Sequence, residues 1–320
     1  MRLSRQRGVA LLVAIVMFAV CTTVAAAITY NKTMAARRAA ATFTMEQALQ
    51  AGMAAEAMAG IVLEQAASNQ QTALHQDWAM PLGPVEIENT GIWIQAQLED
   101  LSGRFNLNSL VTWSAADNLF VANQHQVDVF RELLQHLDID TRYANLMVDW
   151  LDTDINPQPM DGGEDTLYLT QVPPYRPPNT FITHPSELLA LPGFGAENYA
   201  KIAPYVTAGL RADAPVNVCT APALILEVTE NDPQGTSGYD DATLKTLRAK
   251  GCSPVRQHFL AGIQDPARRQ AIEDRVSESS SWFRLRTHIR VGTAEFVLYS
   301  VLLREANNRV RTVQRSFGSE

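Results

Sequence analysis

The stretch that decides the fold is residues 7–28, RGVALLVAIVMFAVCTTVAAAI. From Val9 to Ile28 it holds no charged side chain, and its least apolar members are one cysteine and two threonines. A helix of this length spans about 30 Å, which is the thickness of the hydrocarbon core of a bilayer. Arginines at positions 2, 5 and 7 precede it, so the positive-inside rule keeps the N-terminus in the cytoplasm and exports the rest.

The helical pattern continues beyond this apolar stretch. Residues 42–65 are rich in Ala, Met, Leu and Glu, contain no proline, and repeat apolar side chains every four residues at Met45, Leu49, Met53 and Ala57. We therefore expect one helix of about 55 residues, about 80 Å long. A cleavable secretory signal, cut near the alanines at 25–27, is the alternative. The long apolar run and the continuing helix favour an uncleaved anchor.

Charge is distributed unevenly along the 320 residues, whose formal net charge is −8. Residues 1–40 carry six basic side chains and no acidic one, so the remainder nets −14, which is −8 less 6. Phosphate backbones would repel so acidic a region, which argues against a nucleic-acid binder. Only one segment is long and apolar enough to cross a bilayer, which excludes a polytopic membrane protein.

Strand-like alternation flanks a long helical middle. Residues 84–101 form a hairpin pattern, and the C-terminal part predicts three antiparallel strands at 283–291, 296–303 and 310–317. The stretch between these groups is too long for a loop. We therefore expect an α+β fold: a long N-terminal transmembrane helix plus an antiparallel sheet, interrupted by a large inserted α-helical domain. The helices expected there are 127–137, 141–151, 185–191, 196–207, 221–226, 241–249 and 266–273.

A short basic leader ends at Gly8, and the apolar segment begins directly after it at Val9. This arrangement resembles the start of type IV pilins and type II secretion pseudopilins. In that family a prepilin peptidase cuts after the glycine and methylates the new N-terminus, which implies processing between Gly8 and Val9. Most members have Glu at the fifth mature position, where this chain has Val13. Lack of that Glu is typical of the large minor pseudopilin, the type II secretion system protein K family.

The resemblance covers essentially the whole chain, because its motifs occur in order. After the Gly8–Val9 start come the segment Asp149–Asp152 and the helical hairpin from Glu187 to Pro204. The family implies an organisation of five segments. These are a basic leader peptide at 1–8, the transmembrane part of the long helix at 9–28, the rest of that helix and the first strands at 29–101, the inserted α-helical domain at 102–276, and the C-terminal strands at 277–320.

The resemblance also implies a function that is structural, not enzymatic. A family member of this kind is a minor pseudopilin that caps the tip of the periplasmic pseudopilus and helps initiate its assembly for protein export across the outer membrane. It is a single-pass protein of the bacterial inner membrane with its C-terminal domain in the periplasm. The implied partners are the minor pseudopilins I, J and H, the major pseudopilin, the prepilin peptidase and the inner membrane, with no nucleic acid.

An acidic loop is the best candidate for a binding site. Residues 149–165 contain six carboxylates and neither Lys nor Arg. Asp152, Asp154 and Asn156 match the first ligand positions of an EF-hand, but Pro157 replaces its required glycine. A hard dication would relieve the repulsion, and the calcium-binding inserted domain of the family favours calcium over a solvated acidic turn. The ligands we predict are Asp152, Asp154, Glu164 and Asp165, with Asp149 placed on the preceding helix.

Two cysteines lie in the exported part, where thiols oxidise in an oxidising compartment. We predict a disulfide between Cys219 and Cys252, with two free thiols as the alternative. Cys21 lies in the apolar segment, where we expect it to serve only as one more apolar side chain.

Two alternative functions belong to other classes. Leu188–Gly195 and the helix after it resemble a helix-hairpin-helix, which could bind nucleic acid, but Lys201 is the only cation between residues 180 and 210. A packing role for this hairpin is favoured. A membrane-tethered periplasmic hydrolase would need two converging carboxylates in a pocket, and the sequence contains no nucleophile elbow or phosphate loop.

Overall fold

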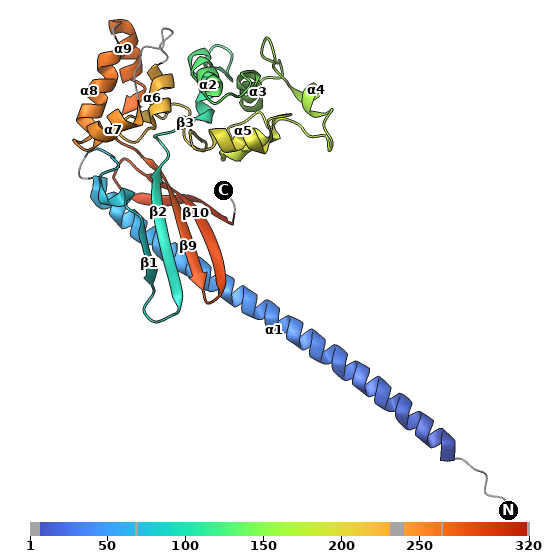
Figure 1. The fold of residues 1–320 in the computed structure, drawn as a ribbon. Coiled ribbons are helices and arrows are strands. Elements are labelled where there is room, and N and C mark those ends of the chain that lie inside the picture. Colours follow the sequence, from blue (N-terminus) through green and yellow to red (C-terminus); the bar gives the residue numbers. More distant parts are fainter. Residues whose placement is uncertain (1–6, 68–69, 231–239, 264, 319–320) are drawn as a thin grey trace, which may run out of the picture.

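The computed structural model describes residues 7–67, 70–230, 240–263 and 265–318. Its most extended element is helix α1, Arg7–Ala66, which runs for 60 residues without a break. The N-terminal half of α1 projects away from the rest of the molecule, and the C-terminal half lies against a sheet (Figure 1). The single long helix expected from the sequence is therefore present, while residues 1–6 of the basic leader lie outside the described residues.

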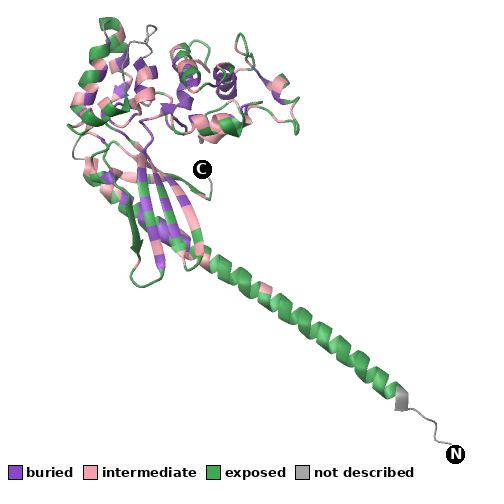
Figure 2. Ribbon diagram, in the orientation of Figure 1, coloured by how far each residue is buried: buried purple, intermediate pink, exposed green. Residues whose placement is uncertain are grey.

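Almost all of the projecting half of α1 is exposed, and the other half buries a stripe of small side chains (Figure 2). The apolar window beginning at Val9 is long enough to cross a membrane and has no buried residue. Further along, the buried side chains recur three or four residues apart, which places them on one helical face. They are Ala48, Ala51, Ala55, Ala59 and Leu63.

Gly52 shows how closely this helix approaches the sheet. A Cβ atom at this position would lie 2.5 Å from Leu298 Cδ2 and 3.3 Å from Ile289 Cδ1, so even a methyl group here would require the Leu298 side chain to shift. Glu56 is the polar member of the same face. Arg315 donates to both its carboxylate oxygens at 2.7–2.9 Å, and Ser300 Oγ donates at 2.6 Å. Burial would raise the pKa of Glu56, but these hydrogen bonds hold it below the ordinary value.

The sheet that α1 covers has five antiparallel strands in the order β1-β2-β9-β10-β11. Strands β2 and β9 are central partners although they lie far apart in the sequence, and their register pairs Ile94 with Ile289. Their inward side chains join the face of α1 in one apolar cluster, where Trp78 packs edge-on against Phe283. The strands are β1 Leu82–Glu86, β2 Ile92–Asp100, β9 Trp282–Val291, β10 Ala294–Arg304 and β11 Val310–Phe317.

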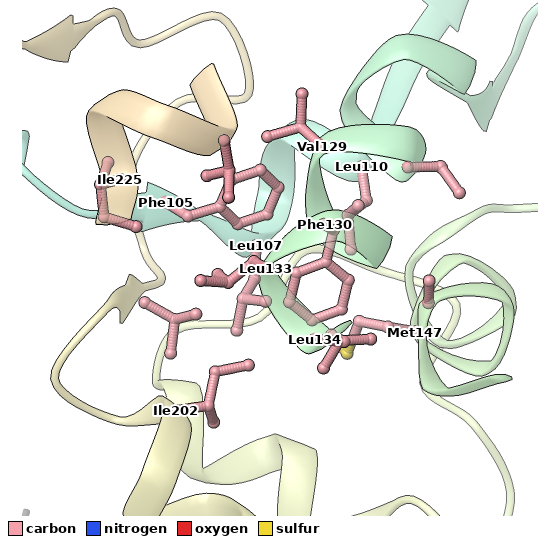
Figure 3. Close-up of a cluster of buried hydrophobic side chains, with 14 of the residues drawn as sticks. Phe105, Leu107, Leu110, Val129, Phe130, Leu133, Leu134, Met147, Ile202 and Ile225 are labelled. Carbon is pink, nitrogen blue, oxygen red and sulfur yellow. The ribbon is translucent and has the colours of Figure 1, made fainter. Parts of the chain in front are cut away.

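The chain between β2 and β9 forms the helical part at the far end of the sheet from the N-terminus of α1 (Figure 1). Its core is a second cluster, in which side chains from β3, α2, α3 and α6 point toward one another (Figure 3). Phe105 and Phe130 stack there with ring centroids 5.3 Å apart. This architecture confirms the expected fold class.

The helices are α2 Gln124–His136, α3 Arg142–Leu151, α4 Asp165–Tyr168, α5 Gly195–Ile202, α6 Ala223–Glu230, α7 Asp241–Arg248, α8 Cys252–Gly262 and α9 Pro266–Glu273, with 3-10 turns η2 Asp77–Ala79, η3 Leu107–Leu110 and η4 Pro185–Ala190.

Short strands join distant parts of this helical region. β3 pairs with β6 in parallel, β7 pairs with β8 in parallel, and β4 pairs with β5 as a hairpin. They are β3 Phe105–Asn106, β4 Val111–Ser114, β5 Leu119–Ala122, β6 Val206–Thr207, β7 Val216–Asn217 and β8 Val276–Ser277.

One helix prediction needs correction, and two helices were missed. The helix expected over 196–207 ends at Ile202, because Pro204 cannot donate to the next turn, and residues 206–207 pair instead with β3. Helices α4 and α8 were not expected from the sequence, and α8 has Pro254 as its third residue. A proline is tolerated in the first turn of a helix, where its missing N–H would have no partner. By contrast, α9 begins as expected, with Asp265 capping the amide of Ala267.

A buried polar network ties the helical part to the sheet where the chain leaves β2 and returns to β9. The carboxylate of Asp100, at the end of β2, accepts hydrogen bonds from Ser102 N at 2.8 Å and Asn217 Nδ2 at 3.0 Å. It also accepts from Thr220 Oγ1 at 2.5 Å and Ser280 Oγ at 2.6 Å. Burial raises the pKa of Asp100, and the four hydrogen bonds oppose that rise. Buried hydrogen-bonded groups of this kind hold connecting segments in a single arrangement.

Candidate metal centre

Three buried carboxylates converge where α3 ends. Asp149, Asp152 and Glu164 each offer one oxygen, and these oxygens all lie within 4.8 Å of one another. Asp149 is in the last turn of α3 and Asp152 directly follows the helix, so their three-residue spacing places both side chains on one side. Glu164 returns to them at the start of α4. The acidic loop between the two helices is closed by this cluster.

The loop is also held by neutral groups. Asn145, on α3, donates from Nδ2 to the carbonyls of Pro159 at 3.2 Å and Met160 at 2.6 Å. The Asp149 carboxylate accepts the amides of Gln158 at 3.0 Å and Gly163 at 2.6 Å. At Gly162 a Cβ atom would lie 2.4 Å from the Gln158 backbone and 2.6 Å from the Asp149 carboxylate. The tight loop therefore requires a residue without a side chain.

Several oxygens at the cluster lack hydrogen-bond partners. Among the described residues, Asp152 Oδ1, Glu164 Oε1 and Asn179 Oδ1 are buried with no partner. Leaving such groups unsatisfied costs on the order of 1–3 kcal/mol each, and more when they are charged. Carboxylate and amide oxygens are the ligands that hard dications such as Ca²⁺ take. The donor set therefore fits a hard dication.

Burial and mutual repulsion shift the acidity of all three carboxyl groups. Desolvation, and then the charge of Asp154, raises the pKa of Asp149 to about 6. Desolvation followed by repulsion from neighbouring carboxylates raises the pKa of Asp152 to about 8 and that of Glu164 to about 7. Each of these carboxyl groups therefore keeps its proton to a higher pH than a carboxyl group in water does. A bound dication would reverse that preference, because metal ligands must be deprotonated.

The structure brings together two of the four ligands predicted from the sequence and adds one further carboxylate. Asp152 and Glu164 are in the cluster, whereas Asp154 and Asp165 are not among the three converging groups. Asp154 caps the amide of Asn156 at 2.7 Å, and Asp165 lies 3.3 Å from Arg176 in an ion pair. Asp149 lies on α3 as expected, but its carboxylate joins the cluster. Its position in the last turn of the helix, three residues before Asp152, was the signal that could have identified it.

Two cysteines of the helical part lie next to each other. Cys219 and Cys252 are joined as a disulfide, with Cα atoms 5.1 Å apart, which is within the usual range for such a bond. Cys21 is exposed on the apolar part of α1. The arrangement agrees with the predicted pairing, whose formation in the cell stays a prediction.

The helical hairpin formed by η4 and α5 is packed into the core. Leu188, Leu191 and Phe194 are buried, and Phe194 meets the Tyr143 ring edge-on at 4.9 Å. Gly193 has φ +80°, a left-handed conformation that glycine adopts without strain. Lys201 lies 3.9 Å from Glu197, so its charge is locally balanced. These contacts support the packing role of the hairpin.

The architecture defines the class of protein: a pilin-like subunit with an N-terminal helix long and apolar enough to cross a membrane, and with a large helical part between strands β2 and β9 of its sheet. Residues 103–210 match the family described as type II secretion system (T2SS), protein K. The chain is 30% identical to type II secretion system protein K of Pectobacterium carotovorum subsp. carotovorum, covering 98% of this chain and 97% of the relative. It belongs to the type II secretion system protein K family.

Other comparisons agree. The protein K of Pseudomonas aeruginosa is 30% identical, with 98% of this chain and 93% of that protein covered. The fold also matches a chain in the crystal structure of the GspK-GspI-GspJ complex of enterotoxigenic Escherichia coli. That match has a TM-score of 0.72 at 24% identity and covers 88% of this chain and all of the other. Family membership makes the chain a component of a protein-secretion system.

Proposed function

We propose that the protein is the minor pseudopilin at the tip of the periplasmic pseudopilus, anchored in the inner membrane by residues 9–28. The observation that carries the proposal is the position of the helical part at the end of the sheet remote from the anchor (Figure 1). Subunits stacked above would meet this bulk, whereas a subunit at the tip has free space there. On this basis we keep residues 102–276 as one inserted domain between pilin-like segments 29–101 and 277–320, after a leader at 1–8.

The anchor supports a terminal position as well. In the pseudopilins that this chain resembles, a carboxylate five residues into the mature chain neutralises the terminal amine of a neighbour. Val13 occupies that position here and has no charge to offer. A subunit that cannot make this pairing fits the end of a filament better than its interior.

A second apolar face of α1 is exposed, which supports an interface with partners that have a similar N-terminal helix. The sheet covers the stripe that includes Ala51 and Ala55, while Met45 and Met53 remain 37% and 40% exposed on another face. A parallel helix placed there would bury apolar area worth roughly 25 cal/mol per Å² before ordering costs. The solved complex that contains GspI and GspJ supports minor pseudopilins I and J as partners. On the basis of the family, we propose minor pseudopilin H, the major pseudopilin and the prepilin peptidase as further partners.

Replacing Leu49 and Met53 by Lys is expected to weaken the complex with minor pseudopilins I and J at least about tenfold, because it places charges in a helix interface. Full-length chains in detergent would be mixed and their co-elution measured by size-exclusion chromatography. Leu82→Lys with Met80→Lys is the matched control, because both of those side chains are exposed elsewhere, at 42% and 63%. Equal weakening of the complex by both pairs of substitutions would contradict the interface. If the chain instead co-elutes with duplex DNA in a salt-sensitive way, and Lys201→Glu abolishes this binding, the nucleic-acid alternative would be supported.

Processing between Gly8 and Val9 gives a second test. We expect the mature chain from membranes to begin at a methylated Val9, and Gly8→Leu to leave the leader attached because a bulky side chain obstructs the cleavage site. Intact mass and N-terminal sequencing measure both results. A mature chain beginning near Ile28 would instead indicate a secretory signal and would remove the membrane anchor from the proposal.

We further propose that the acidic cluster holds calcium through Asp149, Asp152 and Glu164, with the Asn179 side-chain oxygen nearby. The unpartnered buried oxygens support this assignment. The ion would supply positive charge that binds the two ends of the loop together, so its role is structural. Converging carboxylates could also act in a hydrolase, but membership of a secretion-system family favours the structural role over this alternative.

A further inference from the structure

A groove of about 880 Å³ lies in the helical part of the molecule. One wall is the β4–β5 hairpin with the start of α2, and the other is formed by residues 209–216 and the end of α9. Its volume is within the range of about 300–1,000 Å³ that is usual for ligand sites. Asp149, Asp152 and Glu164 are not among the described residues that line it, so the groove is separate from the candidate metal centre.

One end of the groove is aromatic. Trp113 on β4, Phe120 on β5 and Phe181 form a row in which successive rings meet edge to face, with centroids 5.2 Å and 4.8 Å apart. Trp113 and Phe181 remain 51% and 39% exposed. Contiguous exposed apolar side chains that are rimmed by polar groups mark binding sites. This end therefore fits an apolar side chain of a ligand, and an aromatic one would continue the edge-to-face packing.

A partly buried arginine also lines the groove. Arg275, just after α9, has no hydrogen-bond or ion-pair partner for its guanidinium among the residues that the structure describes. The other charged groups of the lining are engaged elsewhere: Arg211 pairs with Asp213 at 2.8 Å, and the exposed Asp274 accepts the Gln270 amide at 3.3 Å. Removing a cation from water without a partner is unfavourable, so Arg275 fits a ligand carboxylate.

Arg275 lies beyond the aromatic row along the same wall. Strand β5, which contains Phe120, ends at Ala122 and leads directly into α2. Burial, and then the charge of Arg275, lowers the pKa of His125 in the first turn of α2, so the guanidinium is close to that turn. The imidazole is therefore neutral at neutral pH and does not compete with Arg275 for an anion. The groove thus has an aromatic end and a basic end.

Side-chain amides lie between the two ends. Asn123 caps α2 without a side-chain hydrogen bond to its backbone, and no other described residue bonds its amide. Gln126 accepts from Ser109 Oγ at 3.5 Å, and its NH₂ group has no partner among the described residues. Both side chains are partly buried and line the groove. Amide groups of this kind both donate and accept, so they match the N–H and C=O groups of an extended polypeptide.

The neighbouring acidic loop gives the ligand a direction. Phe120 N donates to Thr153 Oγ1 at 3.0 Å, and Thr153 N donates to the Phe120 carbonyl at 3.4 Å, so the aromatic end lies against that loop. Residues 149–165 carry six carboxylates. Their repulsion disfavours an acidic ligand group at the aromatic end and directs it to Arg275.

We propose that this groove binds an extended segment of a partner protein, with an aromatic or aliphatic side chain on Trp113 and Phe181 and an acidic side chain on Arg275. Alternate residues of an extended chain lie on one face, about 7 Å apart, so a single short segment presents both groups to the same wall. The guanidinium is a planar fork of donors that matches a carboxylate. The proposal does not depend on the position of the protein at the tip.

Binding of a fluorescein-labelled heptapeptide to the full chain in detergent, measured by fluorescence anisotropy, tests the groove. The peptide has phenylalanine at its second position, glutamate at its fourth and sixth, and glycine elsewhere, so the three side chains share one face. Arg275→Gln is expected to raise the Kd at least about tenfold, which corresponds to about 1.4 kcal/mol. Arg311→Gln is the matched control, because it removes the same charge from an exposed ion pair with Glu305, and its Kd should change less than about twofold.

Two further variants test each end without relying on the stability of the arginine variant. Trp113→Ala removes a side chain that is half exposed, and we expect the Kd to rise about fivefold or more. Trp93→Ala, which removes a tryptophan stacked on Arg290 in the sheet, should leave the Kd unchanged. Asp274→Asn removes the carboxylate next to Arg275 and should tighten binding, whereas a purely structural role for Arg275 predicts no tightening.

Several results would contradict the proposal. Equal losses in the Arg275 and Arg311 variants would mean that only overall charge matters. Equal binding of a peptide with glutamine in place of both glutamates would remove the carboxylate from the proposal, and equal binding of one with serine in place of phenylalanine would remove the aromatic contact. No binding to the unchanged chain at about 1 mM peptide would exclude the groove as a peptide site.

Discussion

Calcium added to the metal-free protein is expected to raise its free energy of unfolding by about 2.7 kcal/mol when the free ion is at 100 times the Kd. The reason is that the ion binds the folded chain, where Asp149, Asp152 and Glu164 are already brought together, and not the unfolded chain. At the same time the Asp152 and Glu164 oxygens that have no hydrogen-bond partner would coordinate the ion. Thermal unfolding of the full chain in detergent, with chelator or with excess calcium, measures the effect.

Matched variants distinguish calcium binding at this cluster from a general effect of removing negative charge from the loop. Asp152→Asn with Glu164→Gln should abolish the calcium-induced rise in Tm, because both are in the cluster. Asp161→Asn, in the exposed part of the same loop, should leave most of it. A rise that persists in the double variant, or no rise in the unchanged chain, would make the loop an acidic turn without a metal.

The pH dependence of this effect follows from the raised pKa values. The folded chain binds protons at Asp149, Glu164 and Asp152 up to pH values of about 6, 7 and 8, while the unfolded chain releases them near 4. The metal-free fold therefore loses stability as the pH rises from about 4 to about 8. Calcium binds the deprotonated forms, so its stabilisation should be larger at pH 8 than at pH 5.5. A larger effect at the lower pH would contradict these ligands.

Removing the disulfide by Cys219→Ala with Cys252→Ala is expected to lower the free energy of unfolding by about 3.5–4 kcal/mol. The bond closes a sequence separation of 33 residues that includes α6 and α7, and it restricts the unfolded chain over that length. Denaturant unfolding of the two full chains gives the difference. Cys21→Ala should have no effect, because Cys21 is exposed on the anchor helix. Identical unfolding of the double variant and the unchanged protein would mean that the thiols are free in the cell.

Local patterns predicted most of the secondary structure because they depend on neighbours in the sequence. The apolar run from Val9 and the four-residue repeat beyond it indicated one helix, and α1 is continuous to Ala66. Alternating side chains marked the strands that became β2, β9, β10 and β11. The helix expected over 196–207 was too long, and helices α4 and α8 and the short strands β3 to β8 were not expected.

The sequence by itself determined the long anchor helix, the strand pattern and an acidic loop, because periodicity, hydropathy and charge act over a few residues. It did not determine which carboxylates of the loop meet. The fold places Asp149 beside Glu164 because the loop closes over the end of α3, and it leaves Asp165 paired with Arg176. Glu99 meets Arg284 across 185 residues only because β2 and β9 are neighbours. Such pairings depend on strand register and chain closure, which only the tertiary structure decided.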